Sequence, residues 1–241
     1  MDINDLEAMV KPEPQPEKKQ WDKPYNKDFK KKPSVNMYEV ETITSKKIDT
    51  DSFEKVGRSF AVHTFEADEE TMKKILVVAN ILVEQGFVFR HNGRNDDNGI
   101  DKLQSKILEI DNIKVEHYLP YAKFNKKVDK SVLVNYYELP FNYAAELYGQ
   151  KFNDLKKGSK ALYANTVQTL LGKDCNNPVD MLLCFSPDGS ERPPVYEKGK
   201  KYDYTKLGSL NFYLRVADVT GISVYNFKNS ESIQSLVKLI K

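Results

Sequence analysis

Cysteine is scarce in this chain, and long apolar runs are missing altogether. The two cysteines, Cys175 and Cys184, are too few for the disulfide framework of a small secreted domain. Cys184 stands in the apolar run 181–185, where a buried thiol is the usual state. No run approaches the roughly 18 apolar residues that a membrane span requires, and residues 1–10 carry acidic side chains and no basic ones. We therefore expect a cytoplasmic protein that is neither secreted nor inserted in a membrane.

The chain also lacks an excess of charge of either sign. Its formal net charge is +2, with a sequence pI near 8.2, so the whole molecule has no large positive field that would attract nucleic acid. Any basic surface must be local. Apolar residues make up 40% of the chain, including 14 tyrosines and 12 phenylalanines, which is enough for a sizeable core.

The N-terminal residues 1–35 differ in composition from the rest. Prolines recur between lysines and acids, and few aliphatic side chains are present, so this segment cannot bury enough apolar surface to offset its ordering entropy. The sequence predicts a disordered tail over residues 1–35, followed by one folded domain over residues 36–241.

Basic and aromatic residues alternate within that tail. Aromatic rings stand at a spacing of four, at Trp21, Tyr25 and Phe29, and the lysines around them are Lys18, Lys19, Lys23, Lys27, Lys30, Lys31 and Lys32. Flexible cations can neutralise phosphates while aromatic rings stack on unpaired bases. Single-stranded DNA is thus the expected partner. A tail that docks on another protein, with residues 1–10 as a short binding helix, and a tail with no specific role stay open as alternatives.

Strands and helices alternate along the rest of the chain, which is typical of a parallel sheet covered on both faces. Apolar runs and spacings predict strands at 59–65, 87–90, 114–119, 179–185 and 222–227. Helical spacing predicts helices at 68–86, 100–110, 142–148, 159–171, 208–219 and 230–240. The expected fold class is α/β: a three-layer, Rossmann-like parallel sheet with helices on both faces.

Polar residues and glycines collect at the carboxyl ends of these strands, where open parallel sheets bind ligands. Glycine permits close approach of the backbone, and arginine pairs with phosphate through two donors. A ligand pocket is therefore expected from His63, Thr64, Arg90, Asn92, Gly93, Arg94, Gly99, Asp101, Gly208 and Ser209.

These segments, in this order and spacing, resemble the SLOG superfamily, which includes DNA-processing protein A and the Lonely Guy nucleotide hydrolases. The resemblance covers roughly residues 56–241: the strand and helix SFAVHTFEADEETMKKILVVANILVEQGFVFR, the loop HNGRNDDNGID, the strand end HYLP, and ALYANTVQTLLGKDCNNPVDMLLCFSPDG followed by LGSLNFYLRVADVTGISVYNF. It implies a Rossmann-like fold with a phosphate-binding pocket at the strand ends. The lysine-rich and asparagine-rich composition fits a bacteriophage origin, for which the host cytoplasm would be the location.

The chain departs from that family at its motifs. His63-Thr64-Phe65 stands where relatives have Gly-Ser-Arg, and Leu207-Gly208-Ser209-Leu210 replaces Thr-Gly-Gly-Thr. The Pro-Gly-Gly-x-Gly-Thr-x-x-Glu signature of the Lonely Guy hydrolases is missing from the sequence. Hydrolase activity is therefore the weaker expectation.

Other enzyme chemistry lacks a motif. His63, His91 and His117 could form a metal site with Asp96, Asp97 or Asp101, but their spacing matches no ligand motif. Neither Ser186 nor Ser209 lies in a G-x-S-x-G elbow, and Asp180 is interpreted as a structural cap. We expect no metal and no cofactor.

The sequence thus favours a non-enzymatic accessory protein that binds single-stranded nucleic acid in replication, recombination or transcription. A protein that binds or hydrolyses a nucleotide derivative at the strand ends is the first alternative. A scaffold that recruits a protein through its tail, with an inert Rossmann-like domain, is the second.

Overall fold

The described part of the chain is built on one six-stranded sheet. The computed structural model describes residues 43–93, 100–121, 124, 131–134, 137–195 and 207–240. All neighbouring strands are parallel, in the order β4-β3-β2-β1-β5-β6. The strands are β1 (Ser59–Thr64), β2 (Val88–His91), β3 (Lys114–Leu119), β4 (Ser131–Leu133), β5 (Met181–Phe185) and β6 (Ser223–Asn226). The α/β, Rossmann-like expectation is confirmed.

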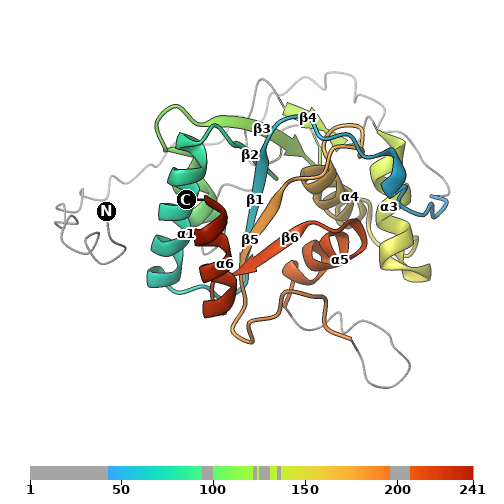
Figure 1. Cartoon of the computed structure of the whole chain (residues 1–241). Helices are drawn as coiled ribbons and strands as arrows, with labels where there is room; N and C mark the ends of the chain where they lie inside the picture. The colour runs from blue at the N-terminus through green and yellow to red at the C-terminus, as the bar shows by residue number, and fades with distance from the viewer. Residues whose placement is uncertain are drawn as a thin grey trace, which may run out of the picture. The chain divides into compact units, whose positions relative to one another are not determined.

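Helices cover both faces of the sheet (Figure 1). One face packs against α1 (Glu69–Glu84), α2 (Ile100–Leu108) and α6 (Ser230–Ile240). The other packs against α3 (Glu138–Tyr148), α4 (Lys157–Leu171) and α5 (Leu210–Thr220). Short 3-10 helices lie at Thr50–Ser52 and Gln150–Phe152. Each face of the sheet has its own apolar core, as expected for three layers.

Strand β1 lies in the middle of the sheet and is buried along its whole length. Successive side chains of a strand point to opposite faces. Phe60 and Val62 accordingly join the core under α1 and α6, whereas Ala61 joins the core under α5. His63 follows Ala61 on the α5 face, so the first polar side chain at this strand end points toward α5.

Helix α1 begins and ends where the sequence predicts. The Asp68 carboxylate accepts a hydrogen bond from the backbone N–H of Thr71 at 2.7 Å, which is the usual N-cap contact. This contact lowers the pKa of Asp68 below its ordinary value. Gly86 follows the helix with a φ of +83°, a conformation that glycine adopts without steric cost. The chain then turns directly into β2.

The segment between β3 and α4 differs most from the prediction. Strand β4 was not expected there, and α3 begins at Glu138 rather than at 142. The strand is only three residues long and pairs with β3 at the outer edge of the sheet. The strand follows a lysine-rich segment and has only three residues, and an apolar run this short does not distinguish a strand from part of a helix.

Candidate functional site at the carboxyl edge of the sheet

The order of the strands places a topological switch point between β1 and β5. From β1 the chain moves outward through β2, β3 and β4, and then returns to the opposite side of β1 with β5. Both strands end at the same edge, because Thr64 pairs with Phe185. Open α/β sheets bind ligands at the carboxyl edge beside such a reversal. Helix α5, which crosses from β5 to β6, begins near this edge.

A histidine, a serine and a tyrosine meet at the switch point. The Nε2 atom of His63 lies 2.8 Å from the hydroxyl oxygen of Ser209, which directly precedes α5. The imidazole ring stacks on the ring of Tyr213, with 4.1 Å between ring centres and 10° between ring planes. His63 and Tyr213 are buried, whereas Ser209 is partly exposed. His63, Ser209 and Tyr213 thus form a polar cluster between β1 and α5, and Ser209 is its partly exposed member.

Two asparagines connect this cluster to β2 and α4. The side-chain amide of Asn92, just after β2, donates to the hydroxyl of Tyr213 at 2.8 Å. The amide of Asn165 in α4 donates to the backbone carbonyl of Asn92, also at 2.8 Å. Both asparagines are buried. Four elements therefore hold the cluster, and Tyr213 and Asn165 belong to it although neither was predicted as a site residue.

Gly208 and Gly93 allow close packing of the backbone at the same edge. Gly208 has a φ of +49°, and a Cβ there would stand 3.1 Å from the ring of Phe65. Gly93 has a φ of +78°, and a Cβ there would overlap the side chain of Leu119. Both positions thus need glycine for its conformation and its small size. Gly93 and Gly208, both predicted for the pocket, thus fix the shape of this edge.

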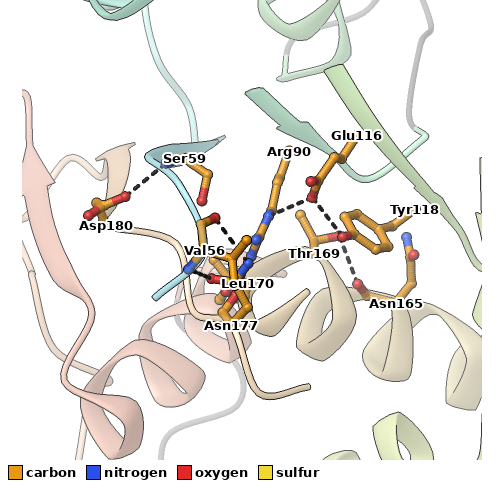
Figure 2. Close-up of polar contacts among 10 residues, drawn as sticks. All are labelled: Val56, Ser59, Arg90, Glu116, Tyr118, Asn165, Thr169, Leu170, Asn177 and Asp180. Carbon is orange, nitrogen blue, oxygen red and sulfur yellow. Dashed lines mark hydrogen bonds and ion pairs between the residues drawn. The ribbon is translucent and has the colours of Figure 1, made fainter. Parts of the chain in front are cut away.

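Arg90 is placed away from the switch point, although the sequence suggested it as a phosphate ligand. Its Nε donates to Glu116 on β3 at 2.9 Å, and its Nη1 donates to the carbonyl of Asn177 at 2.6 Å. The hydroxyl of Tyr118 donates to the same Glu116 oxygen at 2.8 Å (Figure 2). The Arg90 side chain is only 1% exposed. We conclude that Arg90 links β2, β3 and the loop before β5, and its guanidinium is engaged there.

The loop before β5, whose Asn177 accepts a hydrogen bond from Arg90, also contacts the start of β1. The Asp180 carboxylate accepts from the backbone N–H of Ser59 at 2.8 Å and pairs with Lys55 at 3.1 Å. With its amide turned so that the oxygen faces Arg90, Asn177 accepts from Nη2 at 3.0 Å. Figure 2 shows the contact between Asp180 and Ser59 beside Arg90 and Asn177. Asp180 thus has the structural role that its position in the sequence predicted.

The remaining predicted residues lie in different surroundings. Thr64 is buried at the end of β1, and Asp101 belongs to the first turn of α2. Arg94, Gly99 and all of the predicted tail contacts, from Lys18 to Lys32, lie outside the described residues. Of the ten predicted pocket residues, the structure brings His63 and Ser209 into direct contact.

The other two histidines form a separate pair. His91 and His117 are register partners on β2 and β3, and their Nδ1 atoms are 3.1 Å apart. His63 lies on the opposite face of the sheet, so the three histidines do not meet. Within the described residues, no group of three or more histidine, cysteine, aspartate or glutamate side chains could hold a metal ion.

The cysteines offer little thiol reactivity in the folded protein. Both are buried and unbridged. Burial raises the pKa of Cys175 to about 12 and that of Cys184 higher still. Because the thiolate is the reactive form, both thiols remain protonated and unreactive at neutral pH.

No protein-family model, curated protein sequence or solved structure matches this chain. None of the helices within the described ranges has the length and apolar character needed to cross a lipid bilayer.

Proposed function

We propose that this protein is an accessory protein that binds single-stranded nucleic acid and acts in replication, recombination or transcription. The observation that carries the proposal is the alternation of seven lysines with Trp21, Tyr25 and Phe29 in residues 18–32. Lysines contact the phosphates, and the three rings stack on unpaired bases, each stack contributing about 1–3 kcal/mol. Since every base offers a flat face, sequence preference is weak.

The contributions of the aromatic rings and of the lysine charges to binding can be measured separately. A full-length variant with Trp21→Ala, Tyr25→Ala and Phe29→Ala keeps the charge of the tail and removes its rings. We expect it to bind oligothymidine more weakly while retaining the salt dependence of the wild type. A variant with the seven tail lysines changed to glutamine should lose most of that salt dependence.

Three exposed lysines of the folded domain provide a matched control. Lys46, Lys47 and Lys73 are all exposed, and their replacement by glutamine changes the net charge without altering the tail. We expect this variant to retain the wild-type ring contribution and most of the salt slope. Equal losses per lysine replaced in the domain and in the tail would show that binding depends on overall charge, which contradicts the proposal.

A second candidate is binding of a nucleotide derivative at the carboxyl edge. The observation in its favour is the start of α5 beside the switch point, with Gly208, Ser209 and the buried His63 around it. The positive end of the helix dipole at the start of α5 favours anions such as phosphate.

Thermal unfolding tests this candidate without assuming nucleic-acid binding. A nucleotide at one hundred times its Kd should stabilise the folded state by about 2.7 kcal/mol. The variant Gly208→Val should remove that stabilisation, because its side chain would press on the ring of Phe65 and disturb the start of α5. A panel of nucleoside mono-, di- and triphosphates without any shift would reject the candidate. A stoichiometric protein partner that survives nuclease treatment would instead favour the scaffold.

A further inference from the structure

Ser209 does not make the contact that a serine at its position usually makes. It is the N-cap residue of α5, yet its side chain forms no capping hydrogen bond with the helix. A serine at an N-cap ordinarily accepts from a backbone N–H of the first turn. Here the hydroxyl oxygen lies 2.8 Å from Nε2 of His63, which is 146 residues away in the sequence.

The histidine is held in a fixed orientation toward that hydroxyl. His63 is fully buried at the end of β1, and its ring lies nearly parallel to that of Tyr213 at 4.1 Å. Tyr213 is in turn fixed by the hydrogen bond from Asn92. A buried, oriented imidazole within hydrogen-bond distance of the hydroxyl of a partly exposed serine is the geometry of a base and its nucleophile.

The surroundings suit a negatively charged intermediate and an apolar substituent. Ser209 stands at the start of α5, where the positive end of the helix dipole stabilises developing negative charge. The ring of Phe65 packs beside Gly208, next to the serine. An apolar acyl group has a flat, apolar surface to lie against at this position.

We propose that Ser209 is a nucleophile activated by His63, and that its substrate is a carboxylic ester with an apolar acyl group. This inference is independent of nucleic-acid binding by the tail. It requires His63 to carry its proton on Nδ1, so that Nε2 accepts from the serine hydroxyl.

The reaction follows from the positions of these atoms. The Ser209 oxygen bonds to the ester carbonyl carbon while its proton moves to Nε2 of His63. The bond to the alcohol oxygen then breaks, and the alcohol leaves with that proton. Water attacks the acyl-serine and gives a proton to Nε2, and the carboxylic acid departs as Ser209 regains the proton. The net reaction is hydrolysis of the ester to an acid and an alcohol.

An alkyl fluorophosphonate tests the inference on the full-length protein, because it reacts with activated serines and releases fluoride. We expect one phosphonyl group per chain, located on Ser209 by peptide mass spectrometry and lost in Ser209→Ala. The variant His63→Gln should be labelled about 100-fold more slowly, since a general base contributes about 10²–10⁴-fold. Ser223→Ala, an exposed serine on β6, should be labelled like the wild type. An unlabelled wild type, or a folded His63→Gln variant labelled at the wild-type rate, would overturn the proposal.

A second pair of variants covers the case in which His63→Gln does not fold. In Ser209→Cys the histidine should favour the thiolate, so iodoacetamide should alkylate this cysteine about tenfold faster at neutral pH than the one in Ser223→Cys. Equal or slower alkylation of Ser209→Cys would show that His63 does not activate this position. Hydrolysis of a 4-nitrophenyl alkanoate, lost in Ser209→Ala and retained in Ser223→Ala, would support turnover.

Discussion

Changing Glu116 to glutamine tests the interpretation of the Arg90 network as structural. The Arg90 side chain is 1% exposed and that of Glu116 is 44% exposed, with 2.9 Å between Nε and Oε2. The substitution keeps the size of the side chain and removes the charge that compensates the buried guanidinium. Arg90 would retain its hydrogen bond to the carbonyl of Asn177 at 2.6 Å.

The expected loss of stability in Glu116→Gln follows from the exposure of Arg90 and Glu116. Removing one member of a fully buried ion pair costs about 3–5 kcal/mol. Because Glu116 is partly exposed, water screens the pair, and the remaining carbonyl contact solvates Arg90. We therefore expect a loss of about 2 kcal/mol in the free energy of unfolding. In a domain of this size that lowers the Tm by about 4–8 °C.

The assay is urea unfolding followed by circular dichroism, with two comparisons. Glu109→Gln removes an exposed carboxylate that directly follows α2 and should change stability by less than about 0.5 kcal/mol. Tyr118→Phe removes one hydrogen bond to Glu116 and should cost about 0.5–1.5 kcal/mol. Burial raises the pKa of Tyr118, so its hydroxyl remains a donor across the usable pH range. If Glu116→Gln were no more destabilising than Glu109→Gln, the network would not stabilise the fold as argued.

Three further predictions concern glycine, cysteine and a helix cap. Gly86→Ala should lower the free energy of unfolding by about 1–2 kcal/mol, because its φ of +83° is unfavourable for alanine. A Cβ there would contact no other atom of the described residues, so no steric clash adds to this cost. Gly93→Ala should cost about 1–3 kcal/mol more in the same unfolding assay, owing to the overlap with the leucine at the end of β3. Cys175 and Cys184 should resist Ellman's reagent in the native protein and both react after denaturation, since burial raises both pKa values; rapid native labelling would contradict this. Because the pKa of Asp68 is lowered from 3.8 in the folded protein, its carboxylate stabilises the fold at pH values above 3.8, and this stabilisation is lost as the pH falls through the lowered pKa. The stability of Asp68→Asn should therefore depend less on pH. Identical acid titrations of the variant and the wild type would show that Asp68 does not cap α1 as described.

The sequence predicts the fold well because its strongest patterns are local. The continuous apolar run that forms β5 and the capped, periodic segment of α1 need no tertiary information to be recognised. In the described part of the chain, strand β4 pairs with β3 alone, and its short apolar run does not indicate which strand it joins.

The candidate site is less accessible to sequence reasoning. Positions at strand ends correctly indicated His63 and Ser209 as members of one edge, but their direct contact joins residues 146 apart. Tyr213 lies within the apolar spacing of α5, so its contact with the histidine ring could not be distinguished from core packing. Arg90 shows the converse: a residue suited to phosphate binding is engaged in the interior by partners that only the folded sheet supplies.

Binding of single-stranded nucleic acid through the tail can be measured by fluorescence anisotropy with oligothymidine and with a duplex over a range of salt concentrations. If all seven lysines contact phosphates, the logarithm of the association constant should fall with the logarithm of salt concentration with a slope of about −5. Preference for the single strand with a slope of this size is the predicted result. Absence of binding, or equal affinity for the duplex, would contradict the account.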